Sequence, residues 1–176
     1  MKQILMLLAA SAVLWSCQSK PDGFTIEGTI DSPAQGKIYL KSFRNKMFFT
    51  EDSAEIRDGR FQFSGRVEQP LLYGLQSEEM DYPAQFFLEN VSMQVAIKDE
   101  GSVIDIQNSP ENVIFQENAE RAVAEGFNID SLITKFPTSP SAAYFLYRYF
   151  TYQLPLDDLK AVRAKLDPAL DSCPYV

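Results

Sequence analysis

The chain has 176 residues, of which 45% are apolar, and 16 Lys and Arg against 24 Asp and Glu give a net charge of −8. The length favours one domain with a core that needs no metal or disulfide, and the acidic balance argues against nucleic-acid binding, which depends on neutralising phosphates. The chain contains no histidine, which excludes Ser-His-Asp and Cys-His nucleophile activation by its own residues and the usual imidazole metal sites.

The chain begins with the pattern of a bacterial export signal. Lys2 is followed by the apolar run from Ile4 to Leu14, which is shorter than the roughly 20 residues of a membrane-spanning helix and therefore predicts a secretory signal. Leu14-Trp15-Ser16-Cys17 resembles a lipobox, which implies cleavage before Cys17 and diacylation of this cysteine, and such acylation anchors a protein stably to a membrane. An ordinary secreted protein is the alternative. We expect a lipoprotein signal peptide over residues 1–16 and a lipidated tether over residues 17–23.

Residues 24–108 are predicted to form seven or eight short strands. The clearest strand follows the turn dipeptide Asp58-Gly59 and alternates Phe61 and Phe63 on one face with polar residues on the other. The other expected strands are 24–30, 37–43, 47–56, 71–76 (as an edge strand), 85–89, 93–98 and a last one around 104–106. Short strands with frequent turns indicate an antiparallel sandwich or barrel, and we expect a mainly β domain built as an antiparallel β-sandwich.

From Ser109 to Val176 the periodicity becomes helical, which predicts a helical C-terminal tail over residues 109–176. Ser109-Pro110 and Ser139-Pro140 each combine a capping residue with a proline at the first helical position. The helix from Ala142 to Tyr152 carries aromatic residues on every side, which predicts burial on every side. Any uncovered part would be an interaction surface, such as a stacking platform for a flat ligand.

Several segments together resemble a family of Gram-negative lipoproteins. They are the lipobox, FTIEGTI, GKIYLKSF, DGRFQFSGRVEQP, QFFLEN and the final LDPALDSCPYV. In that family a β-rich N-terminal domain of unknown function precedes a thioredoxin-like domain of the thiol–disulfide interchange or alkyl-hydroperoxide-reductase-like type. The resemblance implies that redox chemistry belongs to the thioredoxin-like domain and its Cys-x-x-Cys. This sequence has no Cys-x-x-Cys, so the resemblance supplies no catalytic residue.

The remaining candidates for chemistry are weak. Cys173 begins a segment similar to a glutaredoxin-type Cys-Pro-Tyr-Cys, but Val176 replaces the second cysteine and Asp171 opposes thiolate formation. The densest carboxylates lie in turn-like segments without ligand spacing, which favours solvated loops over a hydrolytic or calcium site; they are Glu78, Glu79, Asp81, Asp99 and Glu100. The triplets around Ser53 and Ser131 resemble bacterial O-glycosylation sites.

We therefore expect no catalytic residue, no cofactor and no metal site. The expected function is a lipid-anchored, non-enzymatic module of the cell envelope, facing the periplasm, that tethers or supports a thioredoxin-like domain or protein partner. Two alternatives remain. The sequence could be the N-terminal fragment of a longer thiol–disulfide oxidoreductase, or a free-standing binding lipoprotein that uses an aromatic surface.

Overall fold

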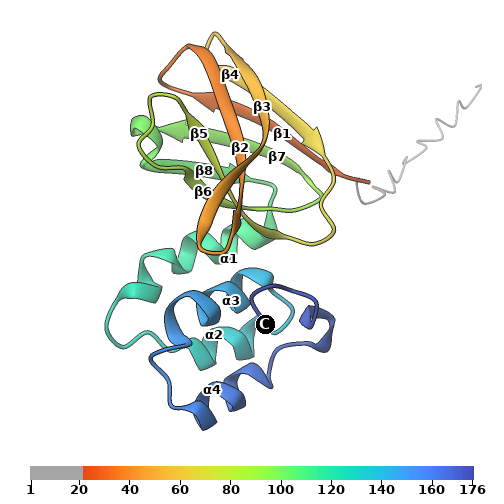
Figure 1. Ribbon diagram of the computed structural model, residues 1–176, viewed down its shortest axis with the longest axis vertical. Coiled ribbons are helices and arrows are strands. Elements are labelled where there is room, and N and C mark those ends of the chain that lie inside the picture. Colours follow the sequence, from red (N-terminus) through yellow and green to blue (C-terminus); the bar gives the residue numbers. More distant parts are fainter. Residues whose placement is uncertain (1–21) are drawn as a thin grey trace, which may run out of the picture.

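The computed structural model describes residues 22–176, which form one β-sheet and a layer of helices (Figure 1). The predicted signal peptide, Cys17 and most of the tether lie outside the described residues. All eight described strands belong to one sheet in the order β6-β5-β2-β3-β4-β1-β7-β8. Their bounds are β1 (Phe24–Ile30), β2 (Gln35–Arg44), β3 (Met47–Arg57), β4 (Arg60–Gly65), β5 (Leu71–Ser77), β6 (Ala84–Leu88), β7 (Ser92–Lys98) and β8 (Val103–Gln107).

The prediction of an antiparallel sandwich is wrong. The eight strands form a single mixed sheet that curls into a nearly closed, barrel-like shape, and β1 pairs in parallel with β7. Periodicity could not reveal this, because the alternation of faces along a strand is the same whichever neighbour the strand pairs with. The placement of 71–76 at an edge is also wrong, since β5 pairs with both β2 and β6.

The predicted alternation of faces is confirmed, and it builds the core inside the barrel. Phe61 and Phe63 are buried, whereas Gln62 between them is exposed. The ring of Phe61 covers Gly28 of the neighbouring strand so closely that a Cβ at residue 28 would lie 2.0 Å from the ring. Only glycine fits beneath this ring.

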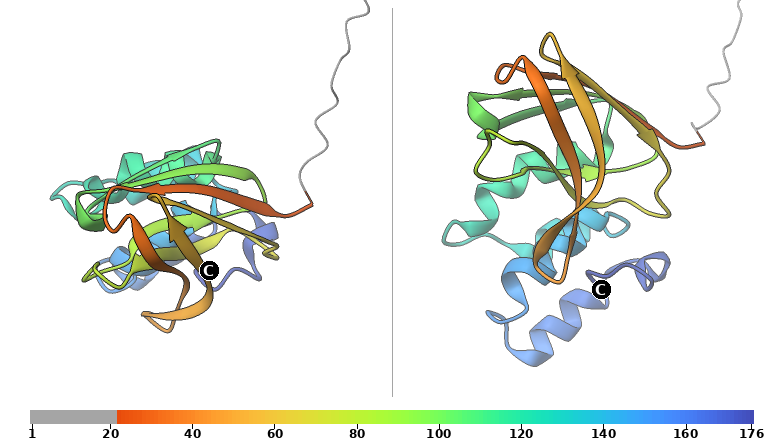
Figure 2. Two further views of the ribbon diagram at one scale, coloured as in Figure 1. Left: turned by 90° about the horizontal axis from the view of Figure 1, so that it is seen from above. Right: turned by 45° about the horizontal axis from the view of Figure 1, so that its top comes forward.

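Strands β3 and β4 separate immediately after the turn that joins them. Asp58 and Gly59 have positive φ values of 51° and 68°, as the turn dipeptide predicts. The pair Arg57–Arg60 is the only one between these two strands, so in the described part of the chain the rest of β3 pairs with β2 alone. The β2–β3 hairpin thus forms an arm that reaches the helical layer (Figure 2), where Phe43 packs edge-on against Tyr144 with ring centroids 6.2 Å apart.

The helical layer follows β8 and lies at one end of the barrel (Figure 1). Its helices are α1 (Pro110–Ala119), η2 (Arg121–Val123), α2 (Ile129–Lys135), α3 (Pro140–Phe145), the π-helical turn η3 (Leu146–Phe150), α4 (Leu156–Arg163) and η4 (Pro168–Leu170), while the short η1 (Asp99–Gly101) joins β7 to β8. Both Ser-Pro pairs start helices as predicted. Ser139 caps α3 by accepting the amide of Ala142. The expected side-chain cap at Ser109 is absent, because its hydroxyl donates to Glu89 instead.

The aromatic helix, α3 with η3, contributes to a second core between the sheet and the other helices. Tyr144, Phe145 and Phe150 are buried, and they belong to one apolar cluster with Leu72 and Phe87 on the outward face of β5 and β6. The expected burial is confirmed for these residues. Farther along, Tyr147 and Tyr149 are half-buried and Tyr152 is 86% exposed, so this helix provides packing rather than a continuous stacking platform.

Candidate functional site

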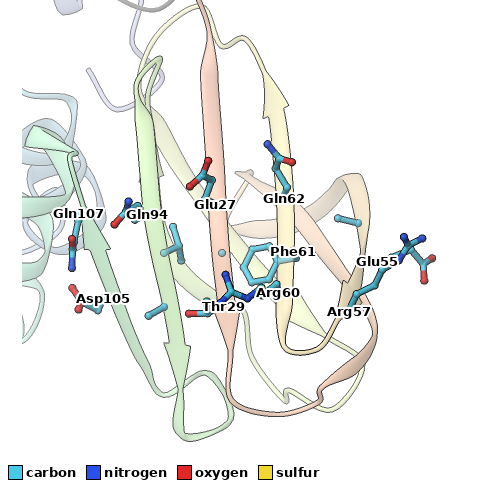
Figure 3. A pocket seen from close by; sticks show the side chains of 14 residues that line it. Glu27, Thr29, Glu55, Arg57, Arg60, Phe61, Gln62, Gln94, Asp105 and Gln107 are labelled. Atoms are coloured by element: carbon cyan, nitrogen blue, oxygen red, sulfur yellow. The ribbon is translucent and has the colours of Figure 1, made fainter.

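A shallow trough of about 750 Å³ crosses the outward face of the barrel from β8 to the end of β3 (Figure 3). Its long polar side chains come from alternate positions of five strands, which is why they share the outward face. The residues that contribute to it are Glu27, Gly28, Thr29, Ala54, Glu55, Arg57, Arg60, Phe61, Gln62, Gln94, Val95, Ala96, Asp105 and Gln107.

Strand register sets four of these side chains in one row, which we name the amide row. Glu27 of β1 lies opposite both Gln62 of β4 and Gln94 of β7, and Gln94 lies opposite Gln107 of β8. Neighbouring strands are about 4.8 Å apart, so the row extends for about 14 Å. Three amides and one carboxylate therefore stand in line across four strands.

A second row, which we name the floor row, runs parallel to the first. Thr29 of β1 lies opposite both Arg60 of β4 and Ala96 of β7, and Ala96 lies opposite Asp105 of β8. In this register the two short residues, Thr29 and Ala96, hold the middle positions of the row, with Arg60 at one end and Asp105 at the other. This arrangement of short residues surrounded by long ones produces the hollow.

The polar groups of the trough are available to a ligand. All members of the amide row, together with Arg60 and Asp105, are exposed. Within residues 22–176, none of the ion pairs involves the trough's charged groups, and the glutamine side chains that form hydrogen bonds are those of other residues. The trough therefore has unused donors and acceptors, with cations at its β3–β4 end.

A second polar cluster, which we name the junction, joins the sheet to α1. Asn112 is fully buried, and its side chain accepts the amide of Phe87 at 2.7 Å and donates to the carbonyl of Phe87 at 2.6 Å. The carboxylate of Glu89 accepts the hydroxyl of Ser109 and the amide of Glu111, the latter at 3.1 Å. Through Asn112, helix α1 thus provides hydrogen-bond partners for the backbone N–H and C=O of Phe87 in β6, as a neighbouring strand would.

The junction continues into α3. The carboxylate of Glu111 accepts the hydroxyl of Ser139 at 2.7 Å and the amide of Ser141 at 3.1 Å. Burial raises the pKa of the Glu89 carboxyl, while the hydrogen bonds from Ser109 and Glu111 act in the opposite direction. Because these carboxylates already accept hydrogen bonds from the protein, we assign the junction a structural role.

Cys173 is 3% exposed, and burial raises the pKa of its thiol. A reactive cysteine needs an accessible thiolate, so this environment disfavours redox chemistry at Cys173. Cys17, the predicted lipidation site, lies outside the described residues.

The loop carboxylates that the sequence analysis singled out do not share a ligand site, because Glu78 and Glu79 form hydrogen bonds with different residues. Glu78 accepts the hydroxyl of Tyr39 at 3.0 Å, and Glu79 accepts that of Ser32 at 3.3 Å. In the described part of the chain, no group of three or more His, Cys, Asp and Glu side chains could hold a metal ion. Ser53 is exposed on β3, and Ser131 is exposed on α2.

The trough was not predicted. Each of its long polar residues has the outward parity of an ordinary solvated strand residue, and only the pairing of β1 with both β4 and β7 brings Glu27, Gln62 and Gln94 together. The single signal available in the sequence was the recurrence of long amides and carboxylates at outward positions of separate strands.

Fold and site define a mainly β protein with a nearly closed, barrel-like sheet, a helical layer at one end and a polar trough on the outward face. Residues 24–115 match the family described as Domain of unknown function (DUF4369), and the chain belongs to this family. The match covers the whole sheet and ends within α1, which confirms the β-rich domain of unknown function indicated by the sequence segments. No curated protein matches the chain. Within residues 22–176, no helix has both the length and the apolar character needed to span a membrane.

Proposed function

We propose that this protein is a lipid-anchored, non-catalytic module of the cell envelope, facing the periplasm, that tethers or supports a thioredoxin-like domain or partner. The observation that carries the proposal is the firm attachment of the helical layer to the barrel. A module that holds a partner at a fixed position must resist bending between its parts. The contacts between the sheet and the helical layer oppose such bending.

Three separate contacts join the two parts. Asn112 binds both backbone groups of Phe87. The hydroxyl of Tyr175 accepts the amide of Leu72 at 3.0 Å, and the arm packs Phe43 against Tyr144. These contacts start from β6, β5 and β2 respectively, so rotation about any one of them would break the other two.

The anchoring part of the proposal is supported by the sequence around Cys17. We expect native cells to incorporate a labelled fatty acid into the wild-type protein, and Cys17→Ser to abolish this incorporation because the acylated thiol is lost. Cys173→Ser is the matched control and should keep the label. Labelling of Cys17→Ser at the wild-type level would contradict lipid anchoring.

The tethering part is addressed by the mass of the native protein extracted from membranes. The 176 residues correspond to 19.9 kDa. A native species near this mass, less the signal peptide and plus lipid, would favour support of a separate thioredoxin-like partner. A species heavier by a domain of about 100–150 residues would favour the alternative of a longer thiol–disulfide oxidoreductase.

The trough favours a second candidate function, that of a binding lipoprotein. In contrast to the aromatic surface expected from the sequence, the available binding groups are amides, carboxylates and guanidinium groups on the barrel.

A further inference from the structure

We propose that the trough is a carbohydrate-binding site, which takes a short glycan lying across β4, β1, β7 and β8. This inference does not depend on tethering or on lipid anchoring. It rests on the amide row, the floor row and the hollow between them.

The chemistry of the amide row matches hydroxyl groups. A hydroxyl both donates and accepts, and a glutamine amide offers one acceptor and two donors on the same plane. A sugar hydroxyl can therefore donate to or accept from the side chains of Gln62, Gln94 and Gln107. The carboxylate of Glu27 accepts from hydroxyl donors. Since the row extends for about 14 Å, it presents these groups along a length that a chain of sugar units can follow.

The floor row provides the space and the stronger contacts. Thr29 and Ala96 leave room for a ring to settle between the longer side chains. Arg60 donates from one end of the hollow and Asp105 accepts at the other, and hydrogen bonds to charged groups are stronger than those between neutral groups. Both groups are exposed, so a ligand reaches them without displacing a protein partner.

The trough suits other ligand classes less well. An extended peptide binds a sheet through unpaired backbone groups at an edge, whereas the centre of the amide row lies over β1 and β7, which pair with neighbours on both sides. An apolar ligand would have to cover the exposed charged and amide groups of both rows, which would lose their contact with water. A nucleic acid would meet a chain with a net charge of −8, which opposes phosphate binding.

The test begins with the purified full chain, fluorescently labelled, on an array of immobilised oligosaccharides built from glucose, galactose, mannose and N-acetylglucosamine. The array glycan bound most strongly is then titrated in solution by calorimetry. We expect Glu27→Ala and Gln94→Ala each to weaken this binding by about tenfold or more. Ala96→Trp should abolish it by filling the hollow.

Gln85→Ala is the matched control, because Gln85 is an exposed glutamine on β6 outside the trough. It should bind as the wild type does, and thermal unfolding should show that all four variants remain folded. The proposal is overturned if no glycan on the array binds, if the trough variants bind like the wild type, or if a parallel peptide array is bound through the trough instead.

Discussion

At the scale of single residues, Glu89 stands out as the one acidic or basic side chain within residues 22–176 that is buried. The residue is 8% exposed, and its carboxylate accepts hydrogen bonds from the hydroxyl of Ser109 and the amide of Glu111. Burial raises its pKa above the ordinary value of 4.5. The folded state therefore favours the protonated form, so stability from this group is present below pH 4.5 and is lost as the pH rises through the higher folded pKa.

The substitution Glu89→Gln tests this pH dependence. The amide oxygen of glutamine can still accept from Ser109 and Glu111 but carries no charge, so the variant should be more stable than the wild type at about pH 7 and similar to it at about pH 4. Urea unfolding at both pH values measures the difference. Glu117→Gln, at an exposed position of α1, should show no such change, and a Glu89→Gln variant that is less stable at neutral pH would contradict the assignment.

At the scale of elements, the β2–β3 arm is the unusual part of the sheet. Each residue from Thr50 to Ser53 is exposed, and the edge of β3 that faces β4 has no backbone partner among the described residues beyond Arg57. Exposed strand edges invite pairing with other chains, and natural proteins oppose this with charges and bulges. The arm carries Glu51, Asp52 and Glu55, and a register irregularity falls between Leu40 and Lys41.

Amide hydrogen exchange distinguishes the two edges of β3. In an antiparallel pair, the amides of alternate residues point toward the partner strand. We therefore expect a two-rate pattern over residues 47–56, with slow exchange for amides bonded to β2 and fast exchange for those on the open edge. Strand β1, which pairs on both sides with β4 and β7, should exchange slowly throughout. Uniformly slow exchange along β3 would show that another segment covers this edge.

Strand positions and buried faces could be predicted because they depend on local alternation. Phe61 and Phe63 are buried on one side of β4 for this reason. Strand order depends on contacts between distant segments, so the parallel pairing of β1 with β7 and the interior position of β5 could not be inferred. The same limit applied to the trough, since Glu27 and Gln94 become neighbours only through that pairing.

At the scale of the whole molecule, the family match ends at residue 115 while the packing continues beyond it. Leu72 and Phe87 on the outward face of β5 and β6 are buried in the same cluster as Phe145 and Tyr175. The matched segment alone therefore leaves an apolar face of its sheet uncovered. Such a face promotes association or loss of packing.

A chain shortened after Phe115 should lack cooperative thermal unfolding and bind a hydrophobic dye strongly, because the cover of Leu72 and Phe87 is removed. Residues 22–176 without the preceding segment are the matched control and should unfold cooperatively without dye binding. Differential scanning fluorimetry together with dye titration measures both. Cooperative unfolding of the shortened chain, without dye binding, would show that the sheet is stable by itself.

The bond between Tyr175 and Leu72 also has a consequence for biosynthesis. Synthesis proceeds from the N-terminus at about 5–20 residues per second, so the outward face of β5 and β6 is made on the order of several seconds before the segment that contains Tyr175. During this interval Leu72 and Phe87 have no complete cover. The growing chain therefore presents a temporary apolar surface, which makes it prone to association until the segment that contains Tyr175 has been made.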